Sequence, residues 1–348
     1  MTFGGEPNSA RMDVSMIVPT HAMTADLERL FRSVAQSSAM PREILVVDDG
    51  SGDDFRPLDA ILPIRVVRLA ERRGPAAARN EGARQATGEW LLFVDSDILF
   101  PPHVLPRVAE ILRENPAPVA INIFSEIEKE YGSFWQKANA LYEYSWMKLA
   151  IPLDSPQCAV AGFWSRTGLI RRDVFLSLGG YNERFTRPTV EDLEFACRFG
   201  ARYSAAAYRD LRVLHQGRSS FRRTAVKYFG TGKDLVRIMA KRGRFYRYML
   251  NPTEAMRGLS CAALALALAL VPLVPSAWPI SVCALVVFLL FHRDMFRVLR
   301  EHGGLCFALA AMAARIPLAT LAYAGGVAGV FTSLREKVGA ISNDSLPS

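Results

Sequence analysis

The chain has 348 residues, half of them hydrophobic and 22% charged, with a formal net charge of +8. Since a single core usually stops growing near ~250 residues, this length predicts one full-sized domain with a further part appended. The polar tail of residues 1–12 has no apolar core long enough for a secretory signal peptide, so it does not predict export. Five cysteines without a C-x-x-C pair argue against a disulfide framework and indicate free thiols in a reducing compartment.

Short apolar strands and helical segments alternate over the first 217 residues. Strands are predicted at residues 14–18, 43–47, 64–69, 89–94, 119–124 and 211–214, and helices at 26–36, 76–87, 126–149 and 193–199. This alternation is typical of an α/β fold with a mostly parallel, Rossmann-like sheet covered by helices, where ligands bind beyond the carboxyl ends of the strands. We therefore predict a catalytic domain over residues 13–217.

Acidic clusters follow two of the predicted strands, as Asp48-Asp49 and Asp95-Ser96-Asp97. Taken singly, each cluster is better explained as turn or helix-cap chemistry. Together, carboxylates at two strand ends suit a nucleotide sugar, whose diphosphate gains negative charge as the sugar–oxygen bond breaks. A divalent metal, Mg²⁺ or Mn²⁺, stabilises such a leaving group when carboxylates hold it. The spacing of Asp95 and Asp97 therefore predicts contacts to the ribose and to the metal.

Further landmarks accompany these clusters in a fixed order along the chain. They are Ile17-Val18-Pro19-Thr20, Val46-Val47-Asp48-Asp49-Gly50-Ser51, Arg79-Asn80-Glu81-Gly82, Asp95-Ser96-Asp97, and Gly179-Gly180-Tyr181 leading to Glu191-Asp192. In this order they resemble the family 2 glycosyltransferases of the GT-A fold, in their membrane-anchored bacterial type, over about residues 14–243. The resemblance implies inverting transfer from a nucleotide-diphosphate sugar, with a UDP-sugar favoured, and a metal at the Asp-x-Asp motif.

Carried over by position, the resemblance assigns the binding residues. Nucleotide-sugar binding falls to Pro19, Thr20, Asp49, Arg79, Asp95 and Ser96. Thr20 and Asp49 would meet the base and ribose, and Arg79 the nucleotide, although a solvated side chain is the default for Arg79 and for a second candidate donor, Arg73. Asp97 is expected to bind the metal. For His215, a further metal ligand and a structural histidine both stay open.

The acidic pair Glu191-Asp192 carries the predicted catalytic role. An acceptor hydroxyl must lose its proton as it attacks, and the resemblance points to Asp192 as the general base, with Glu191 beside it. The alternative is that both residues only begin a helix, where acidic side chains are favourable. The sequence departs from the family pattern at Glu194, where an aspartate is usual, and at Thr189-Val190, where a glycine is common.

Two rival functions differ in the features that they require. A catalytically inactive, membrane-tethered nucleotide-sugar-binding protein would not need both Asp97 and Asp192. Nucleotidyl transfer normally needs a phosphate-cradling Gly-rich loop, which residues 18–21 do not supply. Residues 216–220 also lack the Gln-x-x-Arg-Trp motif of the processive polysaccharide synthases, so we favour single addition over polymerisation.

Residues 218–257 concentrate the positive charge, with eleven Lys and Arg residues against Asp234 and Glu254. Such a face can attract nucleic acid, but it directly precedes the first apolar run, and basic flanks are expected on the cytoplasmic side of a membrane. We therefore predict a basic amphipathic segment on the membrane surface and no nucleic-acid partner. A charged helix with only a topogenic role is the alternative.

Residues 258–334 predict a transmembrane region of two or three helices, followed by a polar tail at 335–348. The runs 258–275 and 276–291 indicate a helical hairpin, and 305–334 is a third apolar stretch that Arg315 and Pro317 interrupt. Arg315 would contact a lipid phosphate or lie at the interface. We expect a multi-pass protein of the inner (cytoplasmic) membrane, its catalytic domain in the cytoplasm, acting on a lipid-linked or cell-envelope glycan acceptor in polysaccharide or glycolipid biosynthesis. A soluble acceptor stays open.

Overall fold

The computed structural model describes residues 10–114, 118–128, 131–150, 156–160, 162–217, 219–242 and 252–344. The chain divides into two compact units. The first comprises residues 1–129 and 150–217, and the second comprises residues 130–149 and 218–348.

Nine strands of the described residues form one sheet in the first unit. They are β1 (Ala10–Thr20), β2 (Ala39–Asp48), β3 (Arg65–Arg68), β4 (Trp90–Val94), β5 (Ile98–Leu99), β6 (Ala120–Glu126), β7 (Gln157–Val160), β8 (Thr167–Arg171) and β9 (Ala205–His215). Their order is β3–β2–β1–β4–β8–β6–β9–β5, with β7 on β9. The first four strands pair in parallel, β8 runs antiparallel between β4 and β6, and β6 pairs with β9 in parallel.

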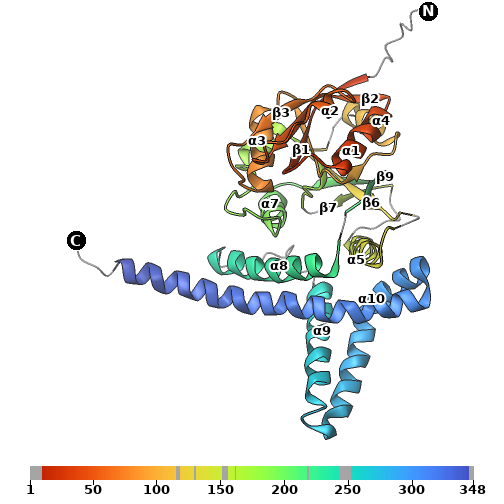
Figure 1. Cartoon of the computed structure of the whole chain (residues 1–348), viewed down its shortest axis with the longest axis vertical. Helices are drawn as coiled ribbons and strands as arrows, with labels where there is room; N and C mark the ends of the chain where they lie inside the picture. The colour runs from red at the N-terminus through yellow and green to blue at the C-terminus, as the bar shows by residue number, and fades with distance from the viewer. Residues whose placement is uncertain are drawn as a thin grey trace, which may run out of the picture. The chain divides into compact units, whose positions relative to one another are not determined.

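Helices pack on both faces of this sheet (Figure 1). They are α1 (Ala25–Ala35), α2 (Arg56–Asp59), α3 (Pro75–Gln85), α4 (Val104–Arg113), α6 (Arg172–Ser177) and α7 (Glu191–Gly200). Because strand side chains alternate between faces, Val14, Met16 and Val18 of β1 join the core that contains α1 and α4. Ile17 joins the core on the other face, with α3 and α7. The predicted α/β class, with helices on a mixed and mostly parallel sheet, is confirmed.

One predicted helix is wrong at its start. The sequence predicted a helix over residues 126–149, but β6 continues to Glu126 and α5 runs from Phe134 to Ala150. The Ser133 hydroxyl accepts the backbone N–H of Gln136, and the Ser133 carbonyl accepts that of Lys137. Ser133 therefore caps the helix, a local hydrogen bond that the apolar pattern did not reveal.

The described residues of the second unit are mainly helical. It contains α5, α8 (Phe221–Arg242), α9 (Pro252–Leu270), a short 3-10 turn at Pro275–Ala277, and α10 (Trp278–Asp344). The two runs that predicted a helical hairpin, 258–275 and 276–291, fall on α9 and on the first part of α10, which lie side by side (Figure 1). Two stretches, Thr253–Leu270 and Pro275–Leu334, are long and apolar enough to cross a membrane by length and composition.

A glycine interrupts α10 within its long apolar stretch. Gly304 has φ 79° and ψ 173°, a backbone conformation that is open to glycine and strained for other residues. Below this break α10 runs beside α9, and beyond it α10 turns across the hairpin and continues to Asp344 (Figure 1). The part of α10 beyond Gly304 is called distal α10 below.

Candidate functional site

Asp48, at the end of β2, builds the turn that follows it. Its carboxylate accepts hydrogen bonds from the N–H and hydroxyl of Ser51 and from the N–H of Gly52, and it pairs with Arg68 at 2.7 Å. Burial raises the pKa of Asp48. These hydrogen bonds and the Arg68 charge lower it by more, so the net shift is downward. The turn interpretation therefore holds for Asp48.

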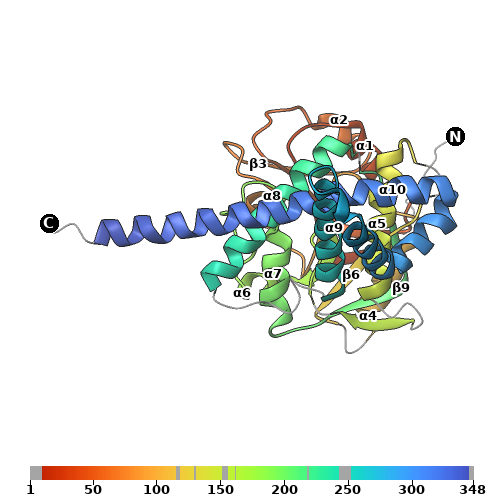
Figure 2. The same ribbon diagram turned by 90° about the horizontal axis from the view of Figure 1, so that it is seen from below.

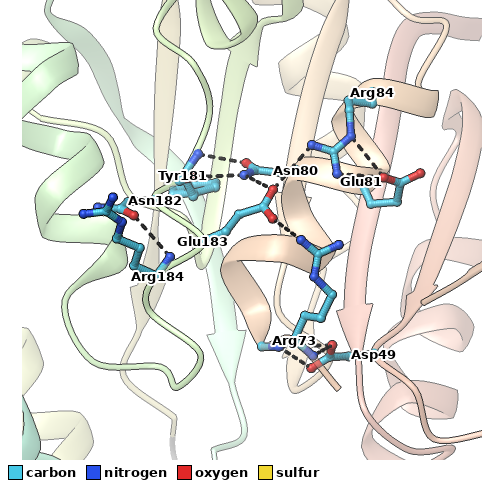
Figure 3. Close-up of polar contacts among 10 residues, drawn as sticks. Asp49, Arg73, Asn80, Glu81, Arg84, Tyr181, Asn182, Glu183 and Arg184 are labelled. Atoms are coloured by element: carbon cyan, nitrogen blue, oxygen red, sulfur yellow. Dashed lines mark hydrogen bonds and ion pairs between the residues drawn. The ribbon is translucent and has the colours of Figure 1, made fainter. Parts of the chain in front are cut away.

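Asp49 connects the same strand end to the start of α3. Its carboxylate accepts the backbone N–H groups of Arg73 at 2.7 Å and Gly74 at 2.9 Å (Figure 3). The Asp49 N–H donates to the carbonyl of Thr20, and the Thr20 hydroxyl donates to the carbonyl of Ala22. The ends of β1 and β2, where nucleotide-sugar binding was predicted at Pro19, Thr20 and Asp49, are thus tied together. Contact of these residues with a nucleotide stays a prediction.

Arg79 joins three elements around one buried guanidinium. Its side chain is 5% exposed, and its Nη2 lies 2.7 Å from an oxygen of Asp95, which follows β4. Its Nη1 lies 3.5 Å from an oxygen of Glu191, at the start of α7. The guanidinium also lies over the ring of Tyr181, 5.7 Å from the centroid. Because a buried charge is stable only when paired, Arg79 holds the two predicted acidic sites together.

Glu191 has a strongly shifted titration. Burial raises its pKa, the charge of Asp192 raises it further, and Arg79 opposes both, so that the pKa of Glu191 is about 7. Its second oxygen accepts the N–H of Thr189. Asp192 is partly exposed, and its carboxylate accepts the N–H of Leu193. The pair thus begins α7, as the helix-start alternative requires, and also provides a carboxylate that solvent can reach.

Asp97 and His215 form a second pair of potential ligands. Short β5 pairs with the end of β9, where Ile98 lies opposite His215, and this pairing brings the His215 Nε2 to 3.3 Å from an Asp97 oxygen. Arg166 lies 3.5 Å from the other ring nitrogen. Burial raises the pKa of Asp97, but the hydrogen bond and charge of His215 and the charge of Arg166 lower it more, which gives a net downward shift.

These donors fit a divalent metal in part. A carboxylate oxygen and an imidazole nitrogen suit Mn²⁺, and a nucleotide diphosphate would add oxygen ligands of its own. Within the described residues no three His, Cys, Asp or Glu side chains gather as a metal-binding group. The predicted ligands Asp97 and His215 therefore lie together, while Asp95 pairs with Arg79.

Sequence reasoning missed the residues that hold the Gly179-Gly180-Tyr181 segment. The Asn80 side chain accepts the Tyr181 N–H at 2.8 Å and donates to the Tyr181 carbonyl at 2.8 Å and to Glu183 at 2.9 Å (Figure 3). Arg73 pairs with the other Glu183 oxygen at 2.6 Å. Gly180 has φ 64°, and a Cβ there would lie 2.5 Å from the Asn80 oxygen. The two adjacent glycines were the available signal, since they permit this close approach.

Arg198 fastens the same segment from the side of α7. Its guanidinium donates to the carbonyls of Leu178 and Gly180 and forms an ion pair with buried Glu194 at 2.7 Å. Glu194, the position that departs from the family pattern, therefore has a structural partner.

Comparison with known proteins agrees with this arrangement. The family model described as glycosyl transferase family 2 matches residues 15–179, from β1 to the glycine pair. Residues 15–179 therefore form a family 2 glycosyltransferase domain, which confirms the resemblance seen in the sequence.

Curated relatives align over shorter stretches. An uncharacterised glycosyltransferase from Haemophilus influenzae is 34% identical over 104 residues, which are 30% of this chain and 35% of the relative. The dolichol-phosphate mannosyltransferase of Pyrococcus furiosus is 32% identical over 115 residues, 32% of each chain. The chain thus spans about a third of the length of these relatives.

A solved structure extends the likeness to nearly the whole chain. The mannosyltransferase PcManGT from Pyrobaculum calidifontis, in complex with GDP-Man and Mn²⁺, matches with a TM-score of 0.52 at 20% identity, over 96% of this chain and 90% of that one. At this identity the likeness concerns the fold, and it confirms the predicted GT-A fold.

The hydrogen bonds of Asn80 to the Tyr181 backbone and to Glu183, called the Asn80 clamp here, can be tested by Asn80→Asp. The change removes the NH₂ donor and places a carboxylate beside the Tyr181 carbonyl and Glu183, so we expect the free energy of unfolding to fall by about 2 kcal/mol, seen as a lower thermal midpoint. Asn182→Asp is the matched control, since it keeps the acceptor that binds the Arg184 N–H. A midpoint for Asn80→Asp equal to that of the control would contradict the clamp.

The raised pKa of Glu191 predicts a pH-dependent effect of Glu191→Gln. The pKa is about 7 in the fold against 4.5 ordinarily, so the stability contributed by this group is complete below pH 4.5 and is lost as the pH rises through 7. The neutral amide escapes this loss, and the thermal midpoint of the variant should exceed that of the parent at pH 8 and approach it near pH 4.5. Glu194→Gln, which breaks the ion pair with Arg198, should be less stable than the parent at pH 8. A pH-independent difference for Glu191→Gln would sink the interpretation.

Proposed function

We propose that the chain is a membrane-associated glycosyltransferase that moves a sugar from a nucleotide-diphosphate sugar to a hydroxyl of a lipid-linked or cell-envelope glycan acceptor. The observation that carries this proposal is the buried Arg79, which joins Asp95 to Glu191 within a family 2 domain. Further support comes from the Asp97–His215 pair, next to Asp95 in the chain.

The donor would bind at the carboxyl ends of β1, β2 and β4. Asp97 and His215 would hold Mg²⁺ or Mn²⁺, which when bound supplies positive charge to the diphosphate as it leaves. Asp95, held by Arg79, would lie on the ribose or diphosphate side, with Ser96 beside it. The PcManGT structure contains GDP-Man and Mn²⁺, whereas the family resemblance favoured a UDP-sugar, so both nucleotides belong in a donor panel.

The acceptor hydroxyl would be activated by Asp192. Its carboxylate is partly exposed at the first turn of α7, and an attack assisted by this base on the face opposite the leaving group inverts the anomeric centre. Neighbouring Glu191, paired with Arg79 and with a pKa of about 7, would share the local charge and position the helix start.

Membrane association rests on the helical unit. Its two apolar stretches are long enough to cross a bilayer, and α8 carries exposed Arg222, Arg223 and Lys227. Basic side chains near an anionic leaflet contribute about 1 kcal/mol each. These features support a location at the inner membrane, with the nucleotide-binding unit in the cytoplasm where nucleotide sugars occur, and they favour a lipid-linked acceptor.

The test of this function is nucleoside diphosphate release by the purified chain, measured against a panel of UDP- and GDP-sugars with Mg²⁺ or Mn²⁺ and a lipid extract as acceptor source. Donor-dependent release that requires the metal supports the proposal. Donor binding without release under every condition would instead identify an inactive nucleotide-sugar-binding protein.

Asp97→Ala should reduce metal-dependent transfer to background with the fold intact, because the metal loses its main protein ligand. Turnover and the thermal midpoint are measured together. Asp173→Ala is the control, since Asp173 is an exposed aspartate that pairs with Arg171 on the surface. Near-normal turnover of Asp97→Ala would remove Asp97 from the metal site.

Asp192→Asn should lower turnover by about 10²–10⁴-fold while donor affinity is kept, because the amide preserves the shape but cannot accept a proton. Turnover and the donor Kd are measured on the same preparation, with the exposed Asp210→Asn as control. A loss of donor affinity as large as the loss of turnover would make Asp192 a binding residue.

A further inference from the structure

Distal α10 packs against α8 with their backbones in direct contact. A Cβ on Gly329 would lie 2.5 Å from the carbonyl oxygen of Lys233, and Cβ atoms on Gly325 and Gly232 would collide with the carbonyls of Phe229 and Ala322. Gly325 meets Phe229, and four residues later on both helices Gly329 meets Lys233. Because the contacts advance in the same direction along α8 and α10, the helices run parallel here. Small residues that let two helices touch in this way fix their mutual position.

The helix α8 cannot cross a bilayer. Its charged residues are Arg222, Arg223, Lys227, Lys233, Asp234, Arg237, Lys241 and Arg242. A charged side chain at the centre of a membrane helix costs about 2.5–3.5 kcal/mol even on the mildest scale. Since Lys233 lies in the contact with Gly329, the turns of α10 around Gly329 must lie at the same depth as α8.

A buried cluster of charges indicates where the helical unit meets the water side of the apolar layer. Arg315 of distal α10 donates to the Tyr228 hydroxyl of α8 and lies 3.5 Å from Glu254 of α9. Glu254 also pairs with Arg257, which is 0% exposed and donates to the Phe291 carbonyl at 2.9 Å. Arg315 thus has protein partners, and the cluster joins the root of the hairpin to α8 and distal α10. Charges of this kind are most stable at the water side of the apolar layer.

We propose, on the basis of the proposed membrane function, that only α9 and the first part of α10 cross the membrane, as one hairpin. Distal α10 then lies in the membrane surface beside α8, although residues 305–334 are apolar enough for a span. Both the catalytic unit and the end of distal α10 are on the cytoplasmic side. Figure 2 shows the hairpin nearly end-on while distal α10 runs across the view, as this arrangement requires.

The surface of distal α10 matches an acyl layer on one side only. Its exposed apolar residues are Leu305, Leu309, Val327, Val330, Phe331 and Leu334, whereas Ala308, Ala311, Met312, Leu318 and Ala319 are buried in the helical unit. An in-plane helix buries such a face in the outer part of the lipid layer while neighbouring basic groups meet anionic headgroups. The occupant of this face is therefore lipid.

The hairpin has the length and flanks of a crossing element. The 19 residues of α9, Pro252–Leu270, extend about 28 Å at ~1.5 Å per residue, close to the ~30 Å hydrocarbon thickness. Trp278, at the turn, is 61% exposed, as expected for an aromatic residue at the far interface. Arg293, Arg297 and Arg300 follow on the returning helix, just before Gly304, where the positive-inside rule expects them.

Cysteine labelling in the full chain tests the topology. In a background where the non-buried Cys158, Cys283 and Cys306 are replaced by serine, one variant carries Ser276→Cys and another a cysteine added after Ser348. A membrane-impermeant maleimide applied to intact cells should label the first and leave the second unlabelled, and permeabilised cells should label both. Labelling of the C-terminal cysteine in intact cells, or of Ser276→Cys only after permeabilisation, would overturn the proposal.

A second measurement tests the helix contact itself, by trypsin cleavage of the chain in liposomes. Gly325→Ala should speed cleavage in α8, because its methyl group collides with the Phe229 carbonyl. Gly326→Ala is the matched control, since its Cβ meets the Val236 side chain at an ordinary 3.4 Å. Equal cleavage of the two variants would overturn the contact. Neither measurement depends on turnover, so a failed transfer assay and a failed topology remain distinguishable.

Discussion

The buried guanidinium of Arg79 is the interaction on which the candidate site depends. An unpaired charge in this position would cost several kcal/mol, so α3, the end of β4 and the start of α7 must all supply their parts at once. Asp95 provides the counter-charge at 2.7 Å, Glu191 lies 3.5 Å from the guanidinium, and Tyr181 provides the ring above it. Asn80, the next residue on α3, holds the Tyr181 backbone. One turn of helix thereby sets the positions of residues from three distant parts of the chain.

The sequence predicted those helices and strands that are determined by their own residues and not by distant partners. Strands β1, β2 and β4 contain short apolar runs that end in turn residues, and α1 has a recognisable apolar face, so the positions of these elements were close. No element was predicted at α4, β5, β7 or β8. β8 depends on pairing with β4 and β6, which lie far away in the sequence. The two residues of β5 acquire their role only through β9, and it is this pairing that brings Asp97 to His215.

In the candidate site, too, the sequence predicted what depends on neighbouring residues, and the structure was needed for contacts between distant ones. Carboxylates at the strand ends identified the chemistry, but only the structure distinguishes Asp48, which serves the turn, from Asp95, which pairs with Arg79. The partners of Asn80 are about a hundred residues away, so no spacing pointed to them. In the helical unit, hydropathy reports how apolar residues 305–334 are, whereas their depth is decided by the charged helix that they touch.

The segment from Gly179 to Glu183 is fastened on two sides, by Asn80 of α3 and Arg73 just before that helix, and by Arg198 from α7. A ligand that binds against this segment meets a surface whose shape exists before it arrives. No conformational entropy is then lost there on binding, and discrimination between ligands follows from fixed geometry and not from closure. Changes in specificity are therefore expected to arise in neighbouring loops, while the segment itself tolerates little variation.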